Sequence, residues 1–177
     1  MHGINKYMGK TYSGKWKPKH PEKYKGDINK IRYRSLWERQ TFKWIEQQKN
    51  VKWWNSEETV IPYICSTDNK VHRYFIDLTV RFTNGKTILV EIKPASQTKP
   101  PKRKNLNEAL SYMKNTSKWK YAKKYAEDRG YKFEIWTEHT LEGFGIRILS
   151  YKNKASKTKV GKRVWKSFKK IKSKRKV

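Results

Sequence analysis

Three ionisable residues interrupt two apolar stretches and could together hydrolyse a phosphodiester bond. Asp77 stands within one apolar run, and Glu91 and Lys93 stand within the next, which ends at Pro94. Such hydrolysis needs a divalent cation held by hard oxygen ligands, and a nearby cationic side chain that orients water or stabilises the transition state. Two carboxylates and one lysine are the minimal set for this chemistry.

These residues also have a simpler interpretation, as the solvent-facing strip of a half-exposed sheet. An acid followed two residues later by a lysine, as in Glu91 and Lys93, occurs often by chance. Asp is disfavoured in strands, however, and here Asp77 lies on the preceding strand of a chain with a formal net charge of +29. The combination favours the chemical interpretation.

The turn between the two strands decides whether the acids meet. Residues 71–82 and 86–93 are rich in β-branched and aromatic side chains and predict a β-hairpin. A two-residue turn would pair Leu78 with Glu91 and send Asp77 to the opposite face. A three-residue loop over residues 83–85, with Gly85 in a left-handed bulge, pairs Asp77 with Glu91 instead. We predict that loop, or a bulge elsewhere between the two carboxylates.

Glu38 is a third candidate acid, because the helix that bears it precedes the strands and could bring a carboxylate to the same cluster. Ser35 and Glu38 also match a capping box, in which each side chain bonds the backbone of the other. The spacing leaves both roles open.

The remaining candidates have weaker patterns. Glu57 and Glu58 precede a predicted strand and are interpreted as solvated residues, with a supporting role at the metal as the alternative. His72 and His139 have no partner at metal-ligand spacing in the sequence, so no catalytic role is assigned to them. Cys65 lies in an apolar run and is expected to be buried.

The periodicity predicts an α/β (α+β) fold, in which a mixed sheet of about four strands is flanked by helices. The expected elements are a helix from Ser35 to Asn50, strands over 59–65, 71–82 and 86–93, a helix from Leu106 that is interrupted at 115–117, a strand over 131–136, and a short helix over 137–143. Pro62 marks its strand as an edge or bulged strand, and Gly130 is a C-terminal stop.

Charge divides the chain into three parts: a basic aromatic arm over 1–34, a nuclease-like domain over 35–145 and a lysine-rich tail over 146–177. The last 27 residues carry 13 Lys and Arg and no acid. This charge favours a polyanion, above all nucleic acid. The arm is suited to lying along phosphates and stacking on bases, or alternatively to covering the core as a packed leader.

Other classes of protein fit less well. The stretch 162–176 places Val164, Trp165, Phe168 and Ile171 at roughly helical spacing among lysines, so a basic membrane-surface role is an alternative to nucleic acid. No apolar run is long enough to span a bilayer, and the N-terminus lacks the apolar core of a signal peptide. One cysteine excludes a disulfide framework and a multi-cysteine zinc site.

Several of these motifs together resemble the head completion nucleases of tailed bacteriophages, a family of the PD-(D/E)XK, or restriction-endonuclease-like, superfamily. The similarity covers roughly residues 11–140, and the matching runs are 12–16, 34–38, 56–63, 73–77, 91–94, 115–120 and 126–133. The chain departs from the superfamily in having Ile76 where a proline is usual before the motif acid, and in its lysine tail.

The resemblance implies a magnesium-dependent nuclease, with manganese as a substitute, that trims packaged double-stranded DNA at the phage portal or neck. It implies that Glu38, Asp77 and Glu91 hold the metal and that Lys93 positions water or stabilises the phosphate. It places the protein in the host cytoplasm during assembly, with association with the virion as a further expectation. A noncatalytic DNA-binding protein of the head–tail connector and a transposon-end or recombination endonuclease are the rival interpretations.

Overall fold

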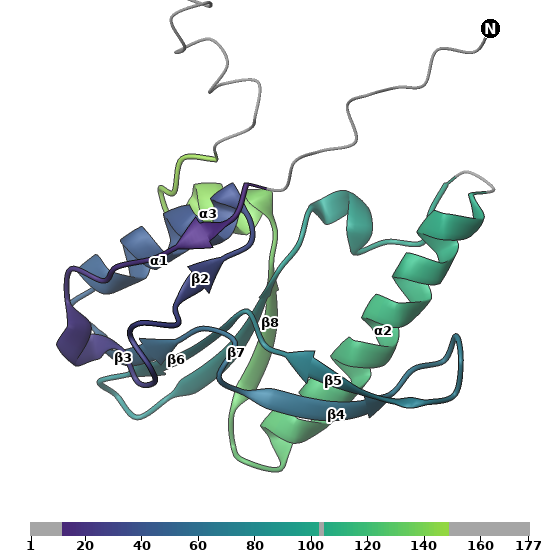
Figure 1. Ribbon diagram of the computed structural model, residues 1–177, viewed down its shortest axis with the longest axis horizontal. Coiled ribbons are helices and arrows are strands. Elements are labelled where there is room, and N and C mark those ends of the chain that lie inside the picture. Colours follow the sequence, from purple (N-terminus) through teal and green to yellow (C-terminus); the bar gives the residue numbers. More distant parts are fainter. Residues whose placement is uncertain (1–11, 103–104, 149–177) are drawn as a thin grey trace, which may run out of the picture. The chain divides into compact units, whose positions relative to one another are not determined.

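A mixed sheet of four strands in the order β3-β6-β7-β8 forms the centre of the computed structural model (Figure 1). The structure describes residues 12–102 and 105–148. The strands are β3 (Val51–Asn55), β6 (Leu78–Phe82), β7 (Thr87–Ile92) and β8 (Lys132–Trp136). The first three pair antiparallel, and β8 pairs parallel with β7. Every residue of β7 is buried, as expected for a central strand covered on both faces.

The two faces of the sheet are covered by different elements. On one face lie α1 (Leu36–Gln47) and the short α3 (Glu138–Gly143). Here Phe42 of α1 packs on Trp54 of β3 with ring centroids 5.1 Å apart. Trp44 packs on Trp136 of β8 and stacks on Phe144, which follows α3. Burial of these aromatic rings is a large part of what fixes α1 to the sheet.

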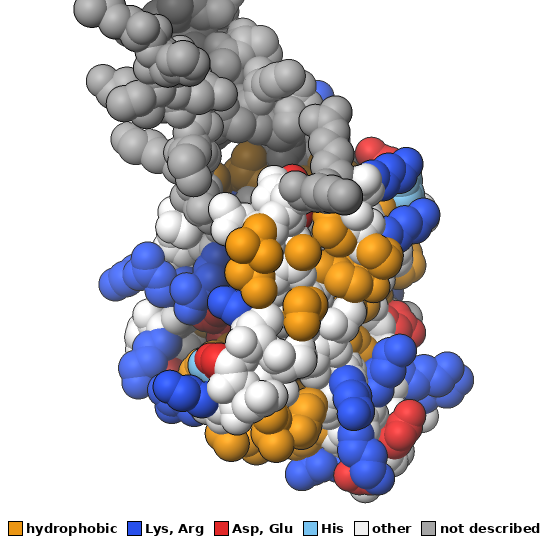
Figure 2. All heavy atoms as spheres, turned by 90° about the vertical axis from the view of Figure 1, so that its right-hand side faces the viewer, with side chains coloured by type: hydrophobic (Ala, Val, Ile, Leu, Met, Phe, Trp, Pro, Cys, Tyr) orange, Lys and Arg blue, Asp and Glu red, His pale blue; other side chains and the backbone are white. Residues whose placement is uncertain are grey.

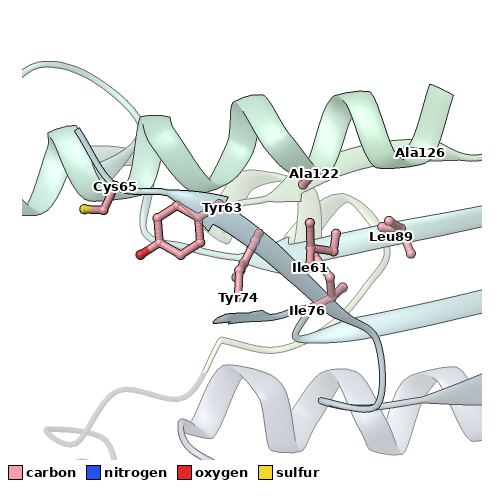
Figure 3. Packing of buried hydrophobic residues seen from close by; sticks show 8 residues of the cluster. All are labelled: Ile61, Tyr63, Cys65, Tyr74, Ile76, Leu89, Ala122 and Ala126. Carbon is pink, nitrogen blue, oxygen red and sulfur yellow. The ribbon is translucent and has the colours of Figure 1, made fainter. Parts of the chain in front are cut away.

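The other face carries α2 (Leu106–Glu127) and a two-stranded ribbon, formed by β4 (Val60–Ile64) and β5 (Val71–Phe75). Eight buried side chains join the ribbon, the sheet and the helix, and Figure 3 shows Ala122 and Ala126 on α2 with the other six below it: Ile61, Tyr63, Cys65, Tyr74, Ile76 and Leu89. The small side chains of Ala122 and Ala126 let the helix approach the ribbon closely. Cys65 is 1% exposed, which confirms its expected burial.

Residues 12–34 contain β1 (Gly14–Lys15), the 3-10 turn η1 (Pro21–Lys23) and β2 (Arg32–Tyr33). Tyr24, Ile31 and Tyr33 are buried, and the indole N–H of Trp16 donates to Glu46 of α1 at 3.4 Å. In this part of the chain the packed-leader interpretation holds. The predicted domain limits, 1–34, 35–145 and 146–177, stay predictions.

The predicted strand over 71–82 is wrong in one respect, since it is two strands in two different sheets. The chain leaves the ribbon at Ile76 and enters the main sheet after Asp77. The carboxylate of Asp77 accepts the backbone N–H of Ile92 at 2.7 Å. A side-chain acceptor thus replaces the backbone carbonyl that would have continued the ladder.

Two other expectations need correction. The sheet gains β3, which the sequence did not predict, and β4 belongs to the ribbon rather than to the sheet. The expected interruption of the long helix at 115–117 is absent, and α2 is continuous from Leu106 to Glu127. The hydroxyls of Thr116 and Ser117 donate to the carbonyl of Met113, both at 2.9 Å, and so are satisfied within the helix rather than capping a new one.

Other expectations are confirmed. Mixed α and β architecture with four strands in the main sheet is present, α3 forms where a short helix was expected, and Gly130 ends α2 with φ of 64°. Pro62 lies in β4, which among the described residues pairs with β5 alone. None of the helices that the structure describes is long and apolar enough to cross a membrane. The basic stretch 162–176 lies outside the described residues.

Candidate active site

The β6–β7 hairpin has the predicted three-residue loop. Phe82 N–H donates to Lys86 O at 2.8 Å, which leaves residues 83–85 as the loop, and Gly85 adopts φ of 84°. In the register of the two strands Leu78 lies opposite Val90. One more step along this register brings Asp77 opposite Glu91, so the two carboxylates share a face of the sheet as expected.

Asp77 lies at the point where the ribbon joins the sheet. Its Oδ2 atom accepts the Ile92 N–H, as described above. Burial raises the pKa of Asp77 well above its ordinary value, and the nearby carboxylates of Glu91 and Glu38 raise it further, against the lowering effect of Lys93 and of the backbone bond. Negative charge at this position is therefore costly without a compensating cation.

Glu91 is only 2% exposed, and both of its carboxylate oxygens are bonded. The Tyr74 hydroxyl donates to Oε2 at 2.6 Å, and Lys93 Nζ lies 3.0 Å from Oε1. Tyr74 is buried, and its pKa is raised by burial first and then by Glu91. Tyr74 was not a candidate from the sequence, because a tyrosine in a strand is most simply a core residue. Its alternation with Ile76 predicts a buried side chain and gives no indication of the contact with Glu91.

Lys93 follows the last residue of β7 and is partly buried. Burial alone lowers its pKa, but the attraction of Glu91 and Asp77 outweighs burial and the net pKa is raised. The side chain is therefore protonated at neutral pH. It can donate hydrogen bonds and compensate negative charge, and it is not suited to accept a proton from water.

Glu38 has the contacts of a helix cap and lies in the same electrostatic cluster. Its N–H donates to Ser35 Oγ at 3.1 Å, while its carboxylate accepts from Ser35 Oγ at 2.8 Å and from the Arg34 N–H at 2.7 Å. Burial raises its pKa most, and Glu57 raises it further, whereas Lys93 lowers it. The cap is real, and the carboxylate is close enough to Asp77 to interact with it.

Of the two acids before β4, only Glu57 belongs to this neighbourhood. Its carboxylate forms a two-pronged ion pair with the guanidinium of Arg34. Glu57 also has φ of 59°, an uncommon backbone for a side chain of this kind, and its N–H donates to Ile76 O at 3.0 Å. Glu58 is exposed and accepts from the Asp27 N–H at 3.3 Å, away from the cluster.

His72 is a partly exposed, hydrogen-bonded histidine, and the absence of a catalytic assignment for it stays a prediction. His72 Nε2 lies 2.9 Å from the carboxylate of Asp68, and Cys65 is close to both. The sequence concealed this group because its members were considered one at a time, and a tight turn brings them together. His139 is exposed on α3.

A pocket of about 440 Å³ lies beside α2, between this helix and the segment that follows β7. Polar side chains line it, among them Gln97, Lys99, Asn107 and Ser111. In the sequence, Lys93 is followed by the 3-10 turn η2 (Ala95–Gln97), which contributes Gln97 to the lining of this pocket. These are side chains that donate hydrogen bonds to phosphate oxygens in DNA complexes.

The donor set of the cluster fits a divalent cation. Glu38, Asp77 and Glu91 offer hard carboxylate oxygens, and the pKa of Asp77 is raised by burial first and then by repulsion from Glu91 and Glu38, which a cation would relieve. Convergence is incomplete, however. Among the described residues, these three do not form a group whose ligand atoms all lie within 4.8 Å of one another, and the Glu38 oxygens are bonded to Ser35 and to the Arg34 N–H.

Comparison with known proteins identifies two similarities. The sequence profile of the TnsA-like endonuclease N-terminal domain matches residues 48–138, a range that contains Asp77, Glu91 and Lys93 but not Glu38. The chain is also 42% identical over 147 residues to the head completion nuclease of Enterobacteria phage T4; the alignment covers 77% of this chain and 98% of that protein.

Proposed function

The chain belongs to the TnsA-like endonuclease family and is a nuclease, and from this premise we propose that it hydrolyses phosphodiester bonds of double-stranded DNA at a site formed by Asp77, Glu91 and Lys93. The observation that carries the proposal is the position of Asp77 beside β7, where its carboxylate accepts the Ile92 N–H at 2.7 Å and interacts electrostatically with Glu91. A buried pair of like charges is costly for folding, and the pair is understandable if it serves to bind a cation.

In this proposal Asp77 and Glu91 would hold a magnesium ion, and Glu38 would supply a third carboxylate on leaving the helix cap. When bound, the cation would compensate the charge of the scissile phosphate and lower the pKa of a bound water. The Ile92 N–H fixes the orientation of the Asp77 carboxylate, and the Tyr74 hydroxyl fixes that of Glu91. Manganese, which accepts the same oxygen ligands, is expected to substitute.

In this site Lys93 provides a positive charge and a hydrogen-bond donor. Because its raised pKa keeps the ammonium protonated, Lys93 Nζ would donate a hydrogen bond to the attacking water or to a nonbridging oxygen of the phosphate. Its present partner, Glu91 Oε1 at 3.0 Å, is one of the atoms proposed to bind the cation. With Glu91 serving as a metal ligand, Lys93 would be available to the phosphate.

Surface charge and the pocket beside α2 support DNA as the substrate. Figure 2 shows Lys and Arg side chains on both flanks of the face that carries α2. The residues of the pocket from Ser96 to Pro101 follow β7 in the sequence. We propose that one strand of the DNA lies along this pocket. The positively charged tail would add nonspecific affinity through counterion release.

The biological setting is inferred from the phage relative, which this chain matches over 98% of that protein's length. We propose that the chain acts in phage head completion and trims packaged DNA before the tail joins. It would contact portal or neck proteins in the host cytoplasm during assembly. Association with the virion is part of the same proposal. An endonuclease of transposition is the second candidate, favoured by the TnsA-like profile. Copurification with phage capsids or portal distinguishes the two settings.

The activity is tested by incubating supercoiled plasmid with the wild-type protein, Asp77→Asn and Lys93→Ala, in Mg²⁺ and in EDTA. Matched controls are Glu127→Gln and Lys86→Ala, which change an exposed acid and an exposed lysine away from the cluster. Wild type and controls should nick or linearise the plasmid only with Mg²⁺ present. Each site variant should lose about two to three orders of magnitude in rate, as expected when a transition-state interaction is removed. If wild type and site variants leave the plasmid equally intact with Mg²⁺ and Mn²⁺, the noncatalytic DNA-binding interpretation replaces this one.

Glu38→Gln separates the cap from a metal role. Glutamine retains an amide oxygen that can accept from Ser35 or from the Arg34 N–H, so thermal stability should fall by less than about 1 kcal/mol. Because an amide is a weaker ligand than a carboxylate, cleavage should require more Mg²⁺ than in the wild type. Unchanged Mg²⁺ dependence would restrict Glu38 to the cap.

A further inference from the structure

The turn that closes the β4–β5 ribbon brings together three metal-binding side chains that the proposed active site does not use. Cys65 follows β4, Asp68 lies within the turn, and His72 is in β5. One ligand atom from each lies within 4.8 Å of the others, and no other three His, Cys, Asp or Glu side chains among residues 12–102 and 105–148 come so close. His72 Nε2 already contacts both Asp68 oxygens, at 3.2 and 2.9 Å.

Backbone hydrogen bonds make this turn a fixed platform. Cys65 N–H donates to Lys70 O at 2.9 Å, and Asn69 N–H donates to Cys65 O at 2.8 Å. Asn69 adopts φ of 54°, which reverses the chain in few residues. The turn is also tied to α2, because Ser66 N–H donates to Ser117 Oγ at 3.2 Å. The ligand atoms are therefore close before any ion binds, and this reduces the cost of ordering them.

The types of ligand select the metal. A thiolate and an imidazole are preferred by zinc and by similar transition metals, whereas magnesium prefers oxygen ligands alone. A Cys65 thiolate and the Asp68 carboxylate together balance the charge of a divalent ion. The hydroxyl of Thr67 lies 3.1 Å from Cys65 Sγ and can donate to the thiolate.

Burial is graded across the group in a way that suits one open coordination position. Cys65 is buried, while the side chains of His72 and Asp68 are 41% and 38% exposed. Figure 3 places Cys65 at one end of the row of core residues, far from Leu89. An ion on the solvent side of the Cys65 sulfur would take three protein ligands and one water, in the tetrahedral arrangement that zinc adopts.

We propose that the turn of the β4–β5 ribbon binds one Zn²⁺ ion through Cys65 Sγ, Asp68 and His72 Nε2. The ion joins the end of β4 to β5 and stabilises the ribbon whose last residue lies two positions before Asp77. The site is separate from the acidic cluster and takes a different metal, so its existence does not depend on the proposed catalysis.

The test uses the full chain, reduced and stripped of metal by a chelator, and titrated with Zn²⁺ in competition with a chromogenic chelator. The wild type should bind one zinc ion per chain in a large excess of Mg²⁺. Cys65→Ser and His72→Asn should each weaken binding by at least about tenfold. His139→Asn, an exposed histidine on α3, and Asp77→Asn should bind as the wild type does. Co²⁺ should give a thiolate charge-transfer absorption in the wild type and in Asp77→Asn, and none in Cys65→Ser.

Zinc should also raise the melting temperature of the wild type and leave that of Cys65→Ser unchanged. If Cys65→Ser fails to fold, the half-exposed His72→Asn decides alone, with metal-free circular dichroism as its control. A wild type that loses all zinc to the chelator overturns the proposal. Equal zinc affinity in His72→Asn and wild type overturns it too, as does loss of the site in Asp77→Asn.

Discussion

Removal of the Tyr74 hydroxyl tests how the Glu91 carboxylate is held. In Tyr74→Phe the ring keeps its packing in the cluster beneath α2 and its position under Lys118. The variant loses one hydrogen bond of 2.6 Å to Glu91 Oε2. That oxygen is left buried with Lys93 as the remaining partner of the carboxylate.

The size of the effect follows from charge and burial. Because the acceptor is a carboxylate that is 2% exposed, the lost bond should cost about 1.5–3 kcal/mol of unfolding free energy. For a chain of this size the melting temperature should fall by about 3–12 °C. In the proposed site Mg²⁺ would compensate the same carboxylate, so the deficit should be smaller with saturating Mg²⁺ than in EDTA.

The assay is chemical or thermal unfolding of wild type, Tyr74→Phe and Tyr121→Phe, each with EDTA and with Mg²⁺. Tyr121 packs against the same cluster, and its variant should lose less than about 0.5 kcal/mol. A Tyr74→Phe deficit no larger than that of Tyr121→Phe would show that the hydrogen bond contributes nothing net. A deficit that Mg²⁺ does not reduce would refute the link between Glu91 and the cation.

Two further predictions concern charge. The pKa of Asp77 is raised above 3.8, so its protonated form stabilises the fold at low pH and stability is lost as pH rises through the folded-state pKa. In EDTA at pH 7, Asp77→Asn should therefore be more stable than the wild type, by about 1.4 kcal/mol for each tenfold increase of proton affinity in the fold, and urea unfolding should show this advantage vanish below about pH 3.8. Truncation after Ser150 removes 13 Lys and Arg and should flatten the salt dependence of DNA binding, by about 0.9 in the log–log slope for each phosphate that the tail neutralises in the full chain; an unchanged slope would mean that the tail does not bind DNA.

The sequence was sufficient for the hairpin that pairs Asp77 with Glu91. Strand residues alternate between faces, so loop length alone determined which side chains could meet, and Gly85 supplied the left-handed position that the longer loop requires. Both roles considered for Glu38 could be stated from spacing. The cap could be checked directly against its hydrogen bonds, whereas the metal role stays a proposal.

What could not be predicted depends on residues that are distant in the sequence. Alternation continues through residues 71–82, and the change of sheet is seen only in the strand pairing, in which β5 pairs with β4 while β6 pairs with β3 and β7. Tyr74 is hydrogen-bonded to Glu91, which lies 17 positions later in the sequence, and a local sequence pattern cannot predict a contact at that separation. The group of Cys65, Asp68 and His72 depends on the detailed path of one turn. In each case tertiary geometry, rather than propensity, brought the side chains together.

The passage of one backbone from ribbon to sheet at Ile76 and Asp77 has a consequence for the order of events in folding. Tyr74 and Asp77 reach their partners on β7 only when the ribbon has closed on the sheet. A newly synthesised or partly opened chain therefore lacks both the orientation of Glu91 and that of Asp77. Because the proposed site needs both orientations, a chain whose ribbon is detached from the sheet is expected not to cleave DNA.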